Sequence, residues 1–184
     1  MLKKFTYLCC LVFLLQTMGC ANQPIGAKYT TDSERMDSLI AKKSSKRDVY
    51  YQIGQPVSVV YRDGQSVWKY SKLDSKKSAG SFIPFLNSFT MGDVWMIKEV
   101  EVFFDSNGIS QSFIKNEKTV TTVLADFFDY DSRNLVQKVN SDVDKIRDEM
   151  KLHNLPFDEP SVREVLNTEN MLAHQFYKDN LRKK

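Results

Sequence analysis

The chain has few of the residues that build disulfide frameworks and metal sites. Its three cysteines all lie within the first twenty of its 184 residues, so no disulfide framework is indicated. Its two histidines, His153 and His174, fall in different predicted helices without ligand-spaced partners. We therefore expect no bound metal ion and no diffusible cofactor.

Charge of one sign and long apolar runs are also scarce. The formal net charge is +3, and no predicted element carries a basic face, which argues against nucleic-acid binding. Beyond residue 20 no apolar stretch is long enough to cross a bilayer. The remaining composition is ordinary for a globular protein, and the length suits one domain with attached segments.

Recognisable catalytic motifs are missing as well. The sequence has no nucleophile elbow, phosphate loop or dinucleotide fingerprint. Asp126, Asp129 and Asp131 suggest calcium ligands. However, a loop from Asp129 has Asn134 and Asn140 where an EF-hand needs glycine and a bidentate glutamate. An enzyme is therefore not expected, and we assign no catalytic residue.

The N-terminus has the pattern of an export signal. A basic pair (3–4) precedes an apolar run of eleven residues (5–15), which suits the central region of a signal peptide. Gly19 directly before Cys20 resembles the lipobox of bacterial lipoproteins, whose cysteine is acylated and becomes the mature N-terminus. Thr17 stands where that motif usually has leucine. The alternative is an ordinary cleaved signal with an incidental cysteine.

The lipobox resemblance implies an address in the cell envelope. Residues 1–19 are then a signal peptide, and residues 20–30 are the lipidated cysteine with a flexible tether. Acyl chains on Cys20, detectable as palmitate, would give a stable membrane anchor. Ala21 rather than Asp follows the cysteine, which by resemblance to Gram-negative lipoproteins implies the outer membrane, facing the periplasm.

Two short helices are predicted next. A capping box at 31–34 begins the first, and Ser45 with Asp48 begins the second. Gly54 permits the helix to end, and Pro56 prevents it from resuming. A basic cluster at the junction of the two helices is interpreted as a solvated corner, or alternatively as a contact to anionic lipid; it comprises Lys42, Lys43, Lys46 and Arg47.

Strands follow the helices. Residues 57–61 form a short arm or edge strand, and a turn at 63–64 leads to a strand at 66–73 with Trp68 and Tyr70 on one face. A second strand (95–104) turns back at Asp105 to Gly108, and alternation gives one apolar face of Val100, Val102, Phe104, Ile109 and Phe113. These patterns predict an α+β fold in which the two preceding helices cover a three-stranded antiparallel sheet.

The order and spacing of these motifs over residues 31–115 resemble the BamE (SmpA/OmlA) family of outer-membrane lipoproteins. The matching positions are Gly54, Pro56, Trp68, Tyr70, Val100, Val102, Phe104, Asp105 and Gly108. The resemblance implies a fold similar to that of the β-lactamase-inhibitor proteins. It also implies a scaffolding role, since the best-known member is a non-catalytic subunit of the machine that assembles outer-membrane β-barrels. The matching residues carry over architecture and no active site.

A long insertion, Asp74 to Asp93, separates the two firm strands. It is too rich in large apolar residues for a simple loop, and the candidate interaction surface is Phe82, Ile83, Phe85, Leu86, Phe89 and Met91. Either these residues fold back and add to the core, or they offer an apolar patch to a partner or to lipid.

The last part of the chain, 116–184, is predicted to be a helical extension. Helical periodicity begins at Thr119, and a final helix starts at a capping box at 161–164. Between them a narrow apolar seam recurs at spacings of three and four, in Val136, Val139, Val143, Ile146 and Met150. The extension is either an α-hairpin packed on the domain or a partner-binding arm.

Together these patterns predict a non-catalytic, lipid-anchored scaffold that binds other envelope proteins, among them outer-membrane assembly machinery. Three alternatives stay open from the residues alone. One is a periplasmic inhibitor acting on a hydrolase, the second is a component of a secretion or conjugation apparatus, and the third is a lipid-binding protein.

Overall fold

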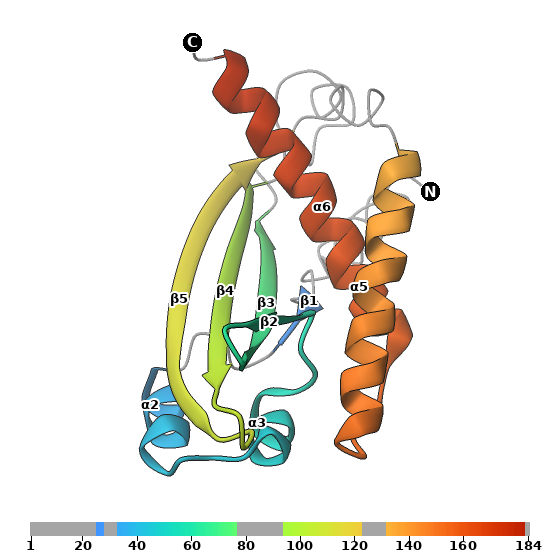
Figure 1. The fold of residues 1–184 in the computed structure, drawn as a ribbon. Helices are drawn as coiled ribbons and strands as arrows, with labels where there is room; N and C mark the ends of the chain where they lie inside the picture. The colour runs from blue at the N-terminus through green and yellow to red at the C-terminus, as the bar shows by residue number, and fades with distance from the viewer. Residues whose placement is uncertain (1–24, 28–32, 77–93, 123–131, 183–184) are drawn as a thin grey trace, which may run out of the picture.

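The computed structural model describes residues 25–27, 33–76, 94–122 and 132–182 (Figure 1). In this part of the chain four helices and a five-stranded antiparallel sheet form an α+β fold, as the sequence predicted. The elements in order are β1 (Ile25–Gly26), α2 (Ser33–Ala41), α3 (Lys46–Ile53), β2 (Ser58–Arg62), β3 (Gln65–Lys76), β4 (Val94–Phe104), β5 (Ser110–Thr121), α5 (Ser132–Leu152) and α6 (Glu159–Arg182).

Local sequence signals explain the bounds of α3. The Asp48 N–H donates to Ser45 Oγ (3.2 Å), and the Ser45 N–H donates to the Asp48 carboxylate (3.0 Å), so the predicted capping box is confirmed. At the other end Gly54 has a φ of +111°, and its N–H donates to the Tyr50 carbonyl at 2.8 Å. Glycine is favoured there because a Cβ would strain this backbone conformation.

The sheet has two strands more than the predicted three. Its order is β1-β3-β4-β5, and β2 also pairs with β3, so β1 and β2 share one edge of β3. The β2–β3 turn places Asp63 and Gly64 at φ values of +50° and +78°, as a two-residue hairpin requires. β1 lies within the segment expected to be a tether, where Ile25 pairs with Leu73 and Gly26 with Lys72.

One face of the sheet carries the main core. Trp68, Tyr70 and Phe104 are all 0% exposed. They pack with residues from all four helices, including Met36, Leu39, Val49, Ile53, Val139, Val143, Ile146, Met150, Val162 and Leu166. The two preceding helices do pack on this face as expected, and α5 and α6 contribute to the same core, so the C-terminal helices pack on the domain, which was one of the two alternatives for them.

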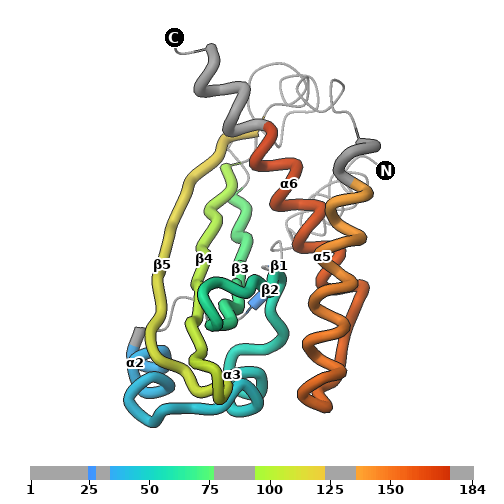
Figure 2. The backbone as a smooth tube through the Cα atoms, in the orientation of Figure 1, coloured from blue at the N-terminus to red at the C-terminus, as the bar shows by residue number. Residues whose placement is uncertain are grey.

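The opposite face of the sheet is also covered in part, which corrects the expectation of a single apolar face. Leu73, Ile97 and Val120 alternate out of phase with the main core, so they lie on the other face. Val165 and Leu172 of α6 pack against them. At 24 residues α6 is long enough to run from its hairpin with α5 toward the far end of β5 (Figure 2).

The β4–β5 register differs from the prediction near the turn. Phe113 lies opposite Val102 and so shares the predicted face, but a register shift between Phe103 and Phe104 places Ser110, and not Ile109, opposite Phe104. Phe113 accordingly packs against the main core, whereas Ile109 forms a bridge with Ser45. One extra residue in β5 changes which side chain faces inward.

Two predicted helix starts are also corrected. β5 continues to Thr121, so residues 119–121 are strand where a helix was expected to begin. α6 begins at Glu159 because Asp158 caps it: the Ser161 N–H donates to Asp158 Oδ1 (3.3 Å), and the Ser161 hydroxyl donates to Oδ2 (2.6 Å). Pro160 fits the first turn, where no intrahelical N–H is needed.

Candidate functional site

The residues singled out from the sequence divide into two groups. The first group lies outside the described residues. It comprises Cys20, the candidate interaction surface between Phe82 and Met91, and the three aspartates Asp126, Asp129 and Asp131. The motif residues within the described part build the fold. Trp68, Tyr70 and Phe104 are core residues, and Asp105 Oδ1 accepts the Asn107 and Ile109 N–H groups at 2.9 Å each.

A buried ion pair joins α3 to α5 across 103 positions of sequence. Lys46 Nζ lies 2.6 Å from Glu149 Oε1, and the two side chains are 9% and 1% exposed. Trp68 Nε1 donates to the same carboxylate oxygen at 2.9 Å, and the Tyr61 hydroxyl donates to Oε2. Both oxygens of the buried carboxylate therefore have hydrogen-bond donors, which a buried charge requires.

Lys46 is enclosed on its other sides by rings. Its Nζ lies 3.2 Å from His153 Nε2, and 5.6 Å and 5.8 Å from the centroids of the Trp68 and Phe104 rings. Its backbone N–H donates to the Gly108 carbonyl at 3.0 Å, which ties the start of α3 to the β4–β5 turn. This ion-pair cluster thus joins α3, α5, β2, β3 and β4.

The sequence interpretation of Lys46 as part of a solvated corner was wrong. Lys46 is 7% exposed, whereas Lys42, Lys43 and Arg47 are exposed as expected. The overlooked signal was spacing: Val49 and Ile53 follow Lys46 by three and seven positions, so all three share the inward face of α3. For Glu149 the sequence gave no comparable sign of burial, because the predicted apolar seam of this helix includes its neighbour Met150 and not Glu149 itself.

The ion-pair cluster makes stability sensitive to acid. Burial raises the pKa of Glu149, but hydrogen bonds from Lys46, Tyr61 and Trp68 outweigh burial and hold the pKa below 4.5. A lowered folded-state pKa stabilises the fold above the unfolded-state pKa, and this stabilisation is lost as the pH falls through the folded-state pKa. The Tyr61 pKa is raised to about 12 by burial and by Glu149.

We therefore expect the free energy of unfolding to fall as the pH drops below about 4.5, and to fall less steeply in Glu149→Gln. Urea unfolding at steps between about pH 3 and pH 7 measures both slopes. Glu164→Gln, which changes an exposed carboxylate, is the matched control and should keep the wild-type slope. Equal slopes in wild type and Glu149→Gln would contradict the assignment.

A cleft of about 620 Å³, within the size range of ligand sites, opens at the end of α3, and no residue of the ion-pair cluster lines it. It lies between β1, the end of α3 with the loop that follows, and the first turns of α6. Its apolar lining consists of Ile25, Ala27, Ile53, Val57, Val162 and Val165. Glu164 is the charged residue among those that line it.

The walls of the cleft are fixed by bonds to backbone atoms. The Gln55 amide donates to the Asp158 carbonyl (2.8 Å) and accepts from the Asp158 N–H (2.9 Å). The Tyr50 hydroxyl donates to the Pro156 carbonyl at 2.8 Å. The end of α3 therefore holds the α5–α6 connection, and with it the start of α6, in one position.

Gly26 forms the third wall by a close approach of β1 to β3. It has a φ of +96°, and a Cβ at this position would lie 2.1 Å from the Ser71 carbonyl oxygen. The next residue, Ala27, donates its N–H to that same oxygen at 2.8 Å. Because hydrogen-bonding residues alternate along a paired strand, the Gly26 N–H and C=O point away from β3.

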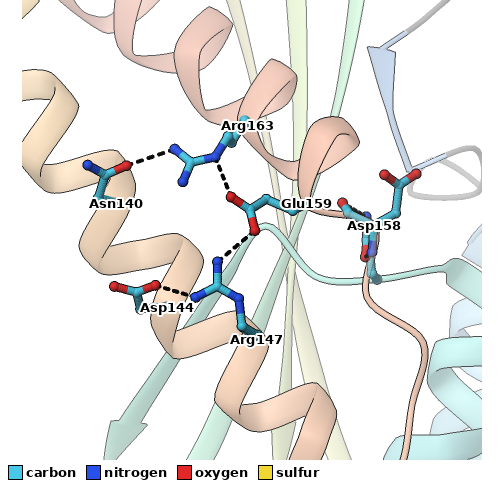
Figure 3. A network of polar contacts seen from close by, with 7 residues as sticks. Asn140, Asp144, Arg147, Asp158, Glu159 and Arg163 are labelled. Atoms are coloured by element: carbon cyan, nitrogen blue, oxygen red, sulfur yellow. Dashed lines mark hydrogen bonds and ion pairs between the residues drawn. The ribbon is translucent and has the colours of Figure 1, made fainter.

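A surface network holds α6 against α5 (Figure 3). Glu159 accepts from Arg147 at 2.6 Å and from Arg163 at 2.7 Å, and these bonds lower its pKa. Arg147 also contacts Asp144 (2.5 Å), and Arg163 contacts Asn140 (2.8 Å). Exposed pairs of this kind contribute little to stability, so the network mainly fixes the orientation of the two helices.

The described residues contain no group of three or more His, Cys, Asp or Glu side chains placed to hold a metal ion. Within the same ranges, no helix is both long and apolar enough to cross a bilayer. The arrangement therefore offers a bounded concave surface with apolar walls, free backbone groups at Gly26 and a carboxylate at Glu164. Comparisons with protein-family models, with characterised proteins and with solved structures found no match.

Proposed function

We propose that this chain is a non-catalytic lipoprotein of the bacterial cell envelope. It is anchored in the outer membrane through acylated Cys20, faces the periplasm and serves as a scaffold for other envelope proteins. The observation that carries the proposal is the lipobox-like sequence ending in Cys20, five positions before the first strand of the folded domain. The resemblance of the strand and turn motifs to the BamE family supports the same role and a related fold.

The position of β1 gives this anchor a structural consequence. Ile25 follows Cys20 by five positions, and a chain of that length spans at most about 17 Å. β1 is hydrogen-bonded to β3 and borders the cleft. An acylated Cys20 would therefore hold the cleft close to the membrane surface. The protein would then act by presenting the cleft to envelope proteins at a limited distance from the membrane.

The cleft suits a segment of a protein partner. Its aliphatic walls can bury apolar side chains, and the outward N–H and C=O of Gly26 can bond an extended backbone. The Glu164 carboxylate at its rim favours a basic residue in the partner. Tyr51, which lines the cleft and is 61% exposed, can add aromatic contact area.

The anchor is tested by Cys20→Ala. We expect this variant to lose palmitate labelling and to leave the membrane fraction, because no other acylation site is predicted. Labelling is measured with radioactive palmitate in cells that express the full chain, followed by fractionation. If labelling and membrane retention persist in the variant, the lipoprotein assignment is wrong.

The scaffold role is tested by a photo-crosslinking residue placed at Gln52, which is exposed and lines the cleft. We expect a discrete adduct with one envelope protein, and no such adduct from a crosslinker at Val136, which is 55% exposed on α5. A soluble peptide with the sequence of the crosslinked segment of the partner, added in excess, should reduce the yield of this adduct. No adduct from Gln52 in intact cells would contradict the role of the cleft.

A further inference from the structure

The α3 wall of the cleft carries an aromatic side chain that is exposed and yet held in place. Tyr51 lines the cleft and is 61% exposed. The ring of Tyr50 meets it edge-on, with the two ring centroids 5.5 Å apart, and Tyr50 is itself fixed by its hydrogen bond to the Pro156 carbonyl. An exposed ring that is already ordered loses little conformational entropy when a partner covers it. Tyr51 therefore has the properties of a contact residue.

A guanidinium group lies over the same ring. Arg47 is exposed and precedes Tyr51 by four positions, so the two side chains are neighbours on the outer side of α3. Its Cζ atom is 5.8 Å from the centroid of the Tyr51 ring, which is within the range of a cation–π contact.

This guanidinium is open to a carboxylate from outside the chain. The carboxylate of the next residue, Asp48, is occupied by Ser45, whose N–H and hydroxyl both donate to Oδ2 at 3.0 Å and 2.6 Å. In the part of the chain that the structure describes, no carboxylate lies within ion-pair distance of Arg47. Arginine and tyrosine are also the residue types that most often dominate the binding energy of protein interfaces.

The α6 wall of the cleft carries the opposite charge. Glu164 lies in the second turn of α6, lines the cleft and is exposed. Asp158, which caps the same helix, adds a second carboxylate beside this wall, because its backbone is bonded to the cleft residue Gln55. The cleft therefore has aliphatic walls between a basic group on α3 and acidic groups on α6.

We propose that the cleft recognises an extended segment of an envelope protein in which aliphatic residues lie between one acidic and one basic residue. The acidic side chain binds Arg47 beside the Tyr51 ring, and the basic side chain binds Glu164. Arginine suits the first contact because its planar group can donate two parallel N–H bonds to a carboxylate while its face stacks on the ring. Recognition of this kind rests on the proposed role of the cleft as a protein-binding site.

The two charges also set the direction in which the segment lies. A segment bound in reverse would bring its acidic residue to Glu164 and its basic residue to Arg47. Like charges brought together across an interface lower affinity, so the reversed arrangement is rejected. The aliphatic walls alone would accept both directions, because they contact apolar side chains without regard to their order.

Charge reversal tests the proposal in intact cells that express the full chain with a photo-crosslinking residue at Gln52. We expect Arg47→Glu and Glu164→Lys each to lower the yield of the partner adduct about tenfold. Arg47→Lys keeps the charge but not the planar fork, so it should lower the yield less. Asp148→Lys and Lys151→Glu, which reverse exposed charges on α5, are the matched controls and should keep the wild-type yield.

The crosslinked segment of the partner provides the second test. Mass spectrometry of the adduct should show an aliphatic stretch with an acidic residue on one side and a basic residue on the other. Replacing that basic residue by glutamate should restore the adduct with Glu164→Lys and not with Arg47→Glu. Equal adduct yields in wild type and both reversal variants, or a segment without the two charges, would overturn the proposal and leave the protein-binding role of the cleft intact. No adduct from Gln52 in the wild-type background would contradict both.

Discussion

Replacing Glu149 by alanine is expected to lower the free energy of unfolding by about 3–5 kcal/mol. The change leaves the Lys46 ammonium buried without its counter-ion, since the lysine side chain is only 9% exposed. It also removes the acceptor for Trp68 Nε1 and for the Tyr61 hydroxyl. Urea unfolding at neutral pH, followed by tryptophan fluorescence, measures the loss.

A double variant separates the cost of the unpaired charge from the loss of side-chain volume. Lys46→Met with Glu149→Leu removes both charges and keeps the space filled, so we expect it to recover most of the loss. Some deficit should remain because Trp68 Nε1 still lacks an acceptor, at about 1–3 kcal/mol. Glu164→Ala, at an exposed position, should change stability by less than about 0.5 kcal/mol. A Glu149→Ala loss as small as that of Glu164→Ala would show that the pair is not structural.

The second large effect is expected from α5. Ile146→Ala should lower the free energy of unfolding by about 2–5 kcal/mol, because Ile146 is 0% exposed in the core that also contains Trp68. Val136→Ala, on the same helix but 55% exposed, should change it by less than about 0.5 kcal/mol. Chemical denaturation of the two variants in parallel gives both values.

The same experiment distinguishes a shared core from a separate helical arm. Tryptophan fluorescence reports on β3 and β4, which hold Trp68 and Trp95, whereas far-ultraviolet circular dichroism reports mainly on the helices. If α5 belongs to the main core, Ile146→Ala shifts both transitions together. A shift in the helical signal alone would mean that the last helices unfold independently.

Local features of the fold could be predicted from the sequence because neighbouring residues determine them. The capping box of Ser45 and Asp48, the helix end at Gly54 and the turn at 63–64 depend on hydrogen bonds or φ angles within a few positions. Strand alternation likewise placed Trp68 and Tyr70 together in the core. These features needed no knowledge of distant segments.

The candidate site could be predicted only in part. Gly54 was identified as a helix end, but its position in a cleft depends on β1 and α6, which the sequence did not bring together. Two residues paired to a strand are too few to give a periodic signal, so β1 was hidden in the expected tether. The alternation of apolar and polar residues also gave no sign of the single extra residue in β5 that moves Ile109 out of the core.

The sequence by itself determined where α3 begins and ends, where the chain turns at 63–64, and that Trp68 and Tyr70 share an apolar face with Val100, Val102 and Phe104. Only the tertiary structure decided that Lys46 is buried against Glu149, that α5 and α6 complete the core, and that β1 closes a cleft. The physical reason is the separation in sequence between the residues that interact. Caps and turns are formed by bonds between close neighbours, whereas the ion pair joins residues 103 positions apart, and its stability depends on the burial that the whole fold provides.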